Sequence, residues 1–236
     1  MTFKLIALLG FIFGLNCALA QTPSAAEKLQ FRTFGWEVSP TDLYYEHQGK
    51  DVKLMVTHSA RSPFYAFEKR NELALYKLVP GPEGKMVRKV VAVANLTSAG
   101  PWPLIVLRKS GESGDALKAV ALADDPKSFP FNTCRFINLT ETDLYAKYGE
   151  EKLKIPAKGI EAADMKAKST SEPEVRNTML VALTGDGPVV IYSNNWVVSH
   201  DKRVLVIITH SASGLRVSRI SDSADQYAQP QNQASR

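Results

Sequence analysis

Apolar and polar residues alternate over much of this chain, which is the pattern of β-strands that bury one face and expose the other. Residues 52–57 read Val-Lys-Leu-Met-Val-Thr, and Lys152–Ile155 reads Lys-Leu-Lys-Ile. By contrast, Val204–Ile208 is apolar throughout and rich in β-branched residues, as expected of a central strand covered on both faces. The pattern therefore predicts short strands along most of the chain.

The stretch Ser128–Ile155 shows this pattern most clearly. It predicts strands over Thr133–Leu139, Leu144–Tyr148 and Lys152–Ile155, joined by tight turns into a meander. Strand-rich sequence lies on both sides of it. We therefore interpret this stretch as the start of a second β unit.

Pro and Gly gather between the apolar runs, for example in Pro80–Gly84 and Gly185–Pro188. Residues 159–168 are ambiguous, because their Ala and Met residues favour a short helix. About a dozen short strands with turn signals between them predict an all-β protein. We expect mostly antiparallel strands in one or two immunoglobulin-like β-sandwiches, tandem or fused, with a division near Asp124.

Two short peptides each occur twice in the sequence, which suggests an internal repeat. Val56–Ala60 and Ile208–Ala212 share the residues Thr-His-Ser-Ala, and the triplet Asn-Leu-Thr occurs at Asn95 and again at Asn138. Two tandem sandwiches would make such pairs natural.

The beginning of the chain predicts export. Lys4 precedes an apolar run, Leu5–Leu15, and Ala18-Leu19-Ala20 supplies the small residues of a signal-peptide cleavage site. The run is shorter than the ~20 residues that cross a bilayer, and no later stretch is longer, so we expect no transmembrane segment. The expected location is the periplasm or the cell exterior. The expected layout is a signal peptide at 1–20, a leader at 21–34, sandwiches at 35–126 and 127–222, and a disordered tail at 223–236.

Charge and cysteine content bear on two questions: whether the protein binds nucleic acid and whether disulfides stabilise it. The chain has 29 Lys and Arg against 24 Asp and Glu, and the basic residues are not clustered as nucleic-acid binding would require. Cys17 would leave with the signal peptide, so Cys134 has no partner within the mature chain. We expect Cys134 to be a buried thiol, with pairing between chains as the alternative. The fold must then be held by its core and not by disulfides.

No motif predicts catalysis or a cofactor. Ser199-His200-Asp201-Lys202 places serine, histidine and aspartate side by side, but a catalytic triad brings such residues from separate parts of a fold. The histidines, His47, His58, His200 and His210, lack metal-ligand spacing. We therefore expect no enzyme activity, no metal and no cofactor.

Several segments resemble a group of secreted bacterial β-sandwich proteins that have no established activity. The resemblance rests on Ser62–Tyr65, Leu73–Tyr76, Phe129–Phe131 followed by Arg135–Leu139, Ser193–Trp196, and a terminal hydrophobic strand. It covers most of the mature chain and implies a fold but no site residues.

Aromatic residues are the remaining candidates for a binding surface, because exposed rings stack on sugars or hold protein partners. They are Trp36, Tyr44, Tyr45, Phe64, Tyr65, Trp102 and Trp196. We expect a non-enzymatic binding or structural module of the cell envelope, whose partners are envelope proteins contacted through a sheet edge or an aromatic patch. The alternatives are a carbohydrate-binding module, which needs two exposed rings on one face, or a hydrolase, which needs a Ser or Asp beside His58, His200 or His210.

Overall fold

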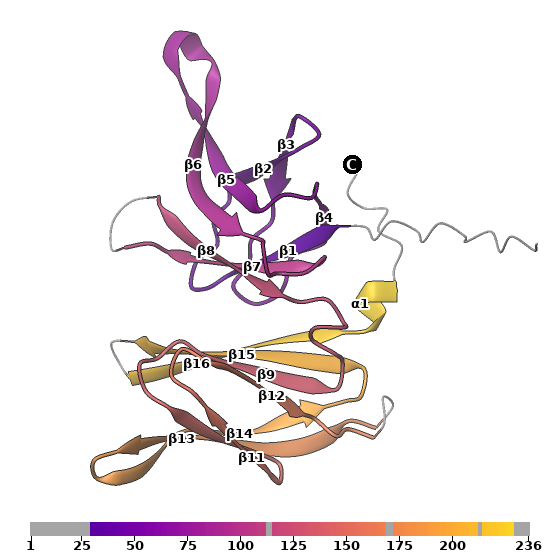
Figure 1. Ribbon diagram of the computed structural model, residues 1–236, viewed down its shortest axis with the longest axis vertical. Coiled ribbons are helices and arrows are strands. Elements are labelled where there is room, and N and C mark those ends of the chain that lie inside the picture. Colours follow the sequence, from indigo (N-terminus) through magenta and orange to yellow (C-terminus); the bar gives the residue numbers. More distant parts are fainter. Residues whose placement is uncertain (1–28, 112–114, 169–171, 212–213, 229–236) are drawn as a thin grey trace, which may run out of the picture.

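The computed structural model describes residues 29–111, 115–168, 172–211 and 214–228, and these residues are almost entirely β (Figure 1). The all-β, mostly antiparallel sandwich class predicted from the alternating pattern is confirmed. The predicted signal peptide and the tail beyond residue 228 lie outside the described residues. Within the described residues, no helix has the length and apolar character that crossing a membrane requires.

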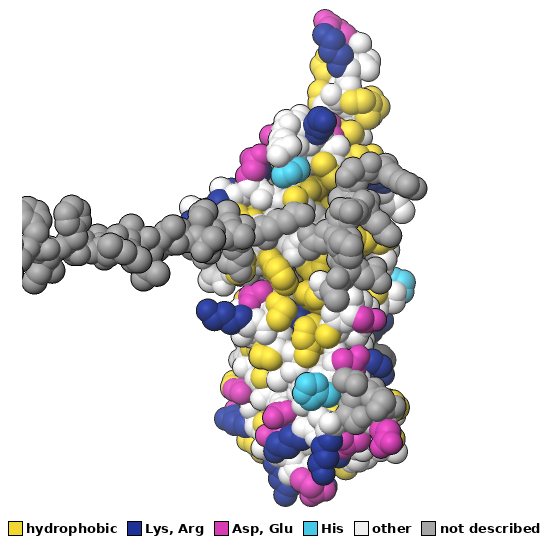
Figure 2. Space-filling model, turned by 90° about the vertical axis from the view of Figure 1, so that its right-hand side faces the viewer, with side chains coloured by type: hydrophobic (Ala, Val, Ile, Leu, Met, Phe, Trp, Pro, Cys, Tyr) yellow, Lys and Arg dark blue, Asp and Glu magenta, His cyan; other side chains and the backbone are white. Residues whose placement is uncertain are grey.

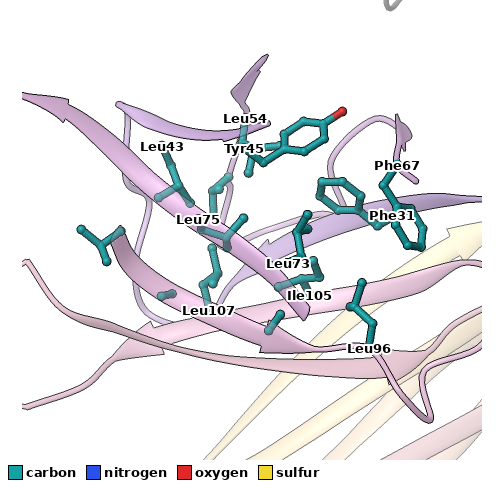
Figure 3. Packing of buried hydrophobic residues seen from close by; sticks show 14 of the residues in the cluster. Phe31, Leu43, Tyr45, Leu54, Phe67, Leu73, Leu75, Leu96, Ile105 and Leu107 are labelled. Carbon is teal, nitrogen blue, oxygen red and sulfur yellow. The ribbon is translucent and has the colours of Figure 1, made fainter. Parts of the chain in front are cut away.

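The first half of the chain forms one pair of sheets, which we call the N-terminal sandwich. Its strands are β1 (Gln30–Gly35), β2 (Leu43–His47), β3 (Lys50–Leu54), β4 (Tyr65–Ala66), β5 (Glu72–Pro80), β6 (Met86–Asn95), β7 (Pro103–Lys109) and β8 (Leu117–Ala123), with a short 3-10 helix η1 (Pro82–Gly84). The sheet orders are β4-β1-β7-β8 and β3-β2-β5-β6. Figure 3 shows side chains from both sheets, such as Phe31 and Leu73, meeting in one apolar core.

The second half forms a C-terminal sandwich. Its strands are β9 (Thr133–Asn138), β10 (Leu144–Tyr148), β11 (Glu151–Ile155), β12 (Ile160–Asp164), β13 (Glu174–Thr184), β14 (Gly187–Val198), β15 (Lys202–Ser211) and β16 (Gly214–Ser223), followed by the one-turn helix α1 (Asp225–Ala228). The sheet orders are β12-β9-β15-β16 and β11-β10-β13-β14. Phe136, Leu180 and Trp196 lie in its separate apolar core.

The two sandwiches share one topology. Adding eight to every strand number converts the sheets of the first into the sheets of the second. Even the parallel pairings correspond, because β1 runs parallel to β7 and β9 runs parallel to β15. Arg32, third in β1, pairs with Leu104, and Arg135, third in β9, pairs with Leu205. The registers therefore align the two copies residue by residue.

The sandwiches pack through equivalent faces. A third apolar cluster joins Phe34 and Leu104 of the first copy to Ile137 and Leu205 of the second. By the register these are matching positions, so the contact resembles the isologous interface of a twofold dimer. β15 lies between two cores, since Val204 faces the core of its own sandwich and Leu205 faces the junction. This explains the continuously apolar run that the sequence shows there.

Several predictions need correction. The strands of Ser128–Ile155 exist, but β9 pairs with β12 and β15, so it lies in a different sheet from β10 and β11, and the meander is wrong. Residues 160–164 form β12 and not a helix, because pairing with β9 outweighs their helix propensity. The leader ends before residue 30, where the fully buried β1 begins. Part of the predicted tail is ordered as α1.

The two peptides that occur twice in the sequence do not lie at equivalent positions of the structural repeat. His58 follows β3, whereas His210 lies within β15, the counterpart of β7. Asn95 ends β6, whereas Asn138 ends β9, the counterpart of β1. The repeat is visible in the topology, and these similar peptides fall at unrelated places within it.

Candidate functional site

The seven predicted aromatic residues do not form a sugar-binding platform. Trp36, Tyr45 and Trp196 are buried in three different apolar clusters. The Tyr45 hydroxyl donates to the Ala66 carbonyl at 2.8 Å, and Trp196 Nε1 donates to the Tyr192 hydroxyl at 2.9 Å. Their rings serve the cores and the junction.

The other four rings are half-buried, and among them only Phe64 and Trp102 contact each other. Tyr44 stacks on Tyr76, with ring centroids 6.5 Å apart. Tyr65 accepts a hydrogen bond from the Met55 backbone N–H at 2.8 Å. Phe64 and Trp102 contact each other edge to face at the junction. None of the seven rings is exposed, so these residues do not supply the two open, aligned rings that a carbohydrate site needs.

A cluster of charged side chains lies buried at one side of the junction. It is in contact with α1, which lies at the side of the molecule where Figure 1 labels it. Arg32 Nη1 donates to both oxygens of Asp222 at 3.1 Å, and Arg203 Nη2 donates to Asp222 Oδ2 at 2.9 Å. Arg61 donates to both oxygens of Asp124, from Nε at 2.9 Å and from Nη2 at 3.0 Å. Arg203 Nη2 also lies 3.3 Å from Asp124 Oδ2, which joins the two carboxylates into one network. We call these five side chains the junction cluster.

Tyr227 of α1 closes the junction cluster. Its hydroxyl donates to Asp222 Oδ2 at 2.8 Å and accepts hydrogen bonds from Arg32, at 3.3 Å, and from Arg203. Burial raises the pKa of Tyr227, so the phenol stays neutral and keeps its proton for this bond. The ring contacts three aromatic side chains taken from both halves of the chain, Phe64, Trp102 and Phe131.

The junction cluster is built to hold the two sandwiches together. Burial acts to raise the pKa of Asp222, but the guanidinium groups of Arg61, Arg32 and Arg203 outweigh that effect, and the pKa lies below its usual value. A carboxylate kept ionised and fully paired does not move protons. Nothing in the local sequence predicts these contacts, since Arg32 and Asp222 are 190 residues apart.

The histidines and the cysteine show little reactive geometry. Ser39 Oγ lies 3.1 Å from His58 Nδ1 beside a surface pocket of about 470 Å³, which is the serine–histidine contact that the hydrolase alternative needs. No carboxylate in the described segments bonds to His58, so the contact lacks the third member of a triad. Ser199 bonds to Asp201 and not to His200. Burial raises the pKa of the Cys134 thiol, which is fully buried. Within the described residues, no group of three or more His, Cys, Asp or Glu is placed to hold a metal.

A groove of about 840 Å³ opens between the two sandwiches, lined by residues of β7, β8, β9 and β15. The hairpins of β7–β8 and β15–β16 end on the side of the molecule opposite α1 (Figure 1). Half of the residues that line the groove are apolar, and two of these, Val120 and Leu139, are 44% and 45% exposed at its rim. The other half are polar or charged: Arg108, Lys118, Thr140, Glu141, Lys158, Thr209 and His210.

β14 forms a long open edge of the C-terminal sandwich. It spans 12 residues, Gly187–Val198, and contains no charged side chain. Val189, Val190 and Val197 are each about half exposed, at 47%, 54% and 57%. Among the described residues, β14 pairs with β13 alone, whereas β6, the counterpart of β14, pairs with β5 and also lies against β8. The sequence predicts a strand here, but it does not show that the strand lies at an edge.

The surface differs from one region to another. Figure 2 shows hydrophobic side chains gathered across the middle of the face that carries α1, with charged side chains concentrated at the lower end, in the C-terminal sandwich.

Comparison of the sequence with protein-family models and with curated proteins gave no match. The resemblance to secreted bacterial β-sandwich proteins stays a prediction.

Proposed function

We propose that this protein is an exported, non-enzymatic module of the cell envelope that binds an extended segment of a partner protein along β14. In this mode the partner adds a strand to the sheet, and backbone hydrogen bonds supply much of the affinity. The proposal rests on the open edge of β14. Its partner is expected to present an uncharged, β-branched or small-residue strand that matches the valines of β14.

The comparison of edge strands carries this proposal. Natural sheets protect their edges with charged side chains, prolines, bulges or short strands, because an open edge pairs with other chains. The other described edge strands, β3, β6, β8, β11, β12 and β16, each contain at least one charged residue, and β4 has only two residues. β14 is the longest of the described edge strands, and only the two-residue β4 shares its lack of charged side chains; its protection is limited to Pro188 near its start and an irregularity in its pairing opposite Leu180 and Val181. Such an edge favours association.

The test is site-specific photo-crosslinking in the envelope of the cell that produces the protein. A photoreactive residue at position 190 should yield an adduct with a partner protein. The same residue at position 93 of β6 should not, although Val93 is similarly exposed, at 46%. Val190→Lys places a charge on the edge and should abolish the adduct, whereas Val93→Lys should leave it unchanged.

Two results would contradict the proposal. Equal crosslinking at positions 190 and 93 would show that β14 is not a specific surface. An adduct made only with a second copy of the chain, together with self-association that Val190→Lys abolishes, would show that β14 serves assembly and not capture of a partner.

A further inference from the structure

The equivalent faces of the two sandwiches differ in one respect at the junction. Arg216 of β16 crosses to Glu37 of the N-terminal sandwich, with Arg216 Nη1 2.6 Å from Glu37 Oε1. The register matches Arg216 to Lys118, because each lies four residues before the apolar residue that pairs with Leu205 or Leu104. The interface therefore contains the same cation position twice.

Lys118 lacks the acid that its counterpart has. Glu37 lies five residues after Arg32, and the matching position in the second copy, five residues after Arg135, is Thr140. The Thr140 hydroxyl is neutral and bonds to Asn138 Oδ1 at 2.7 Å. The ion pair that closes one side of the junction therefore has no equivalent on the other side, and the groove opens there.

A second free cation lies beside Lys118. Arg108 is its direct partner across the β7–β8 ladder, and both side chains are exposed on the groove. Like charges placed directly opposite each other destabilise a sheet. Glu141 is the acidic residue among those that line the groove, and it is paired with Lys158 at 2.9 Å. Neither Arg108 nor Lys118 has an acidic partner among the described residues.

The apolar residues of the groove indicate which kind of molecule would fit beside the two cations. Trp36, Val106 and Ile207 line its walls, and Val120 and Leu139 leave apolar surface exposed at the rim. Its volume, about 840 Å³, falls within the roughly 300–1,000 Å³ of small-molecule sites, which are mostly apolar with a few polar groups. A free cation pair beside an apolar groove matches a molecule with an acidic head and a hydrocarbon chain.

We propose that the interdomain groove binds a small amphipathic carboxylate, with its head between Arg108 and Lys118 and its hydrocarbon chain along the apolar wall. The anion relieves the repulsion between the two cations and supplies the charge that Thr140 lacks. The chain covers apolar surface that would otherwise face water. This site is separate from β14 and does not depend on the partner proposed for that strand.

The test is calorimetric titration of the mature protein with octanoate, decanoate and dodecanoate below their micelle concentrations. Affinity should rise roughly fourfold for each added methylene that the groove buries. Dodecyltrimethylammonium, with the same chain and a cationic head, should bind at least tenfold more weakly than dodecanoate. Binding should also change the fluorescence of Trp36, which lines the groove.

The variants separate the head from the chain. Arg108→Gln with Lys118→Gln should weaken decanoate binding about tenfold, given the modest strength of exposed ion pairs. The matched control is Lys147→Gln with Lys152→Gln, which removes another directly opposed pair of cations that does not line the groove and should leave binding unchanged. Leu139→Asp, at an exposed position, should remove the dependence on chain length.

Each contrary result is distinct. Unchanged affinity in the Arg108 and Lys118 variant, equal binding of the cationic amphiphile, or no effect of chain length would overturn the proposal. So would binding of a poly-glutamate peptide without binding of alkanoates, since that result would assign the groove to an acidic protein segment. Val190→Lys should leave decanoate binding intact, so failure of the β14 proposal would be seen separately.

Discussion

Neutralising Asp222 is the sharpest test of what holds the two sandwiches together. The Asp222 side chain is 1% exposed and receives hydrogen bonds from Arg32 of the other sandwich, from Arg203, and from Tyr227. The junction cluster contains three guanidinium groups and two carboxylates, a formal charge of +1. Asp222→Asn would raise that charge to +2 with almost no change in side-chain volume.

The expected loss is large because the remaining charges stay buried. Removing one partner of a buried ion pair costs about 3–5 kcal/mol, a large part of the roughly 5–15 kcal/mol that stabilises a folded protein. With a urea dependence near 2–3 kcal/mol per M for a chain of this size, the midpoint of Asp222→Asn should fall by about 1–2.5 M. Urea unfolding followed by circular dichroism and tryptophan fluorescence measures this shift.

A surface carboxylate provides the matched control. Asp115 lies 2.6 Å from Lys77 but its side chain is 52% exposed, so Asp115→Asn makes the same chemical change in water. It should cost less than about 1 kcal/mol. If Asp222→Asn costs no more than Asp115→Asn, the junction cluster does not stabilise the fold and the reasoning is wrong.

The companion substitution distinguishes charge from packing. Arg32→Met removes one of the cations that Asp222→Asn leaves uncompensated, and losing both partners of a buried ion pair costs less than leaving one charge unpaired. The double variant should therefore be more stable than the sum of the two single losses implies. Strict additivity would show that the two side chains act independently.

Four further predictions concern the junction cluster and two other tightly packed positions, Cys134 and Gly35. The pKa of Asp222 is lowered in the folded state. Its contribution to the free energy of unfolding is therefore full above the unfolded pKa of about 3.9 and is lost as the pH falls through the folded pKa. Urea midpoints should drop below about pH 4, and less steeply in Asp222→Asn. Tyr227→Phe removes the hydroxyl and its bonds but keeps the ring, and should cost about 1–3 kcal/mol in the same urea assay. Maleimide labelling of Cys134 should proceed only as fast as the chain unfolds, because the thiol is fully buried and its pKa is raised; fast labelling of the native protein would contradict this. Gly35→Ala would place a Cβ 1.9 Å from the Val38 carbonyl oxygen, and should destabilise the fold by about 1–3 kcal/mol or more, seen as a lower thermal midpoint.

The strands themselves were predictable because their signals are local. The alternation in Lys152–Ile155 and the apolar run of Val204–Ile208 each reflect which neighbours cover a few consecutive residues. Both segments are strands in the structure, within β11 and β15. Residues 160–164 show the limit of such signals, since their composition favours a helix while the ladder with β9 makes them a strand.

The arrangement of the strands was not predictable from the same signals. β9 and β15 pair in parallel although about 70 residues separate them, and no local pattern specifies that partner. The charged junction was hidden for the same reason. One signal was present in hindsight: Arg203 directly precedes the apolar run of β15, and a charged residue within a buried strand needs a partner. The sequence indicates that a partner exists but not which residue it is.

The two copies provide their own control for assigning function. A feature that the topology requires, such as the parallel central pair or the apolar junction face, occurs in both copies. A feature found in one copy needs another explanation. β6 lies against β8 whereas β14 is open, and Glu37 completes an ion pair whereas Thr140 does not. Both differences leave surface uncovered where the other copy covers it, at a cost in stability that the shared fold does not demand. That asymmetry is the physical reason for placing the binding surfaces at β14 and at the groove beside Lys118, and not at the aromatic rings that both sandwiches use to fill their interiors.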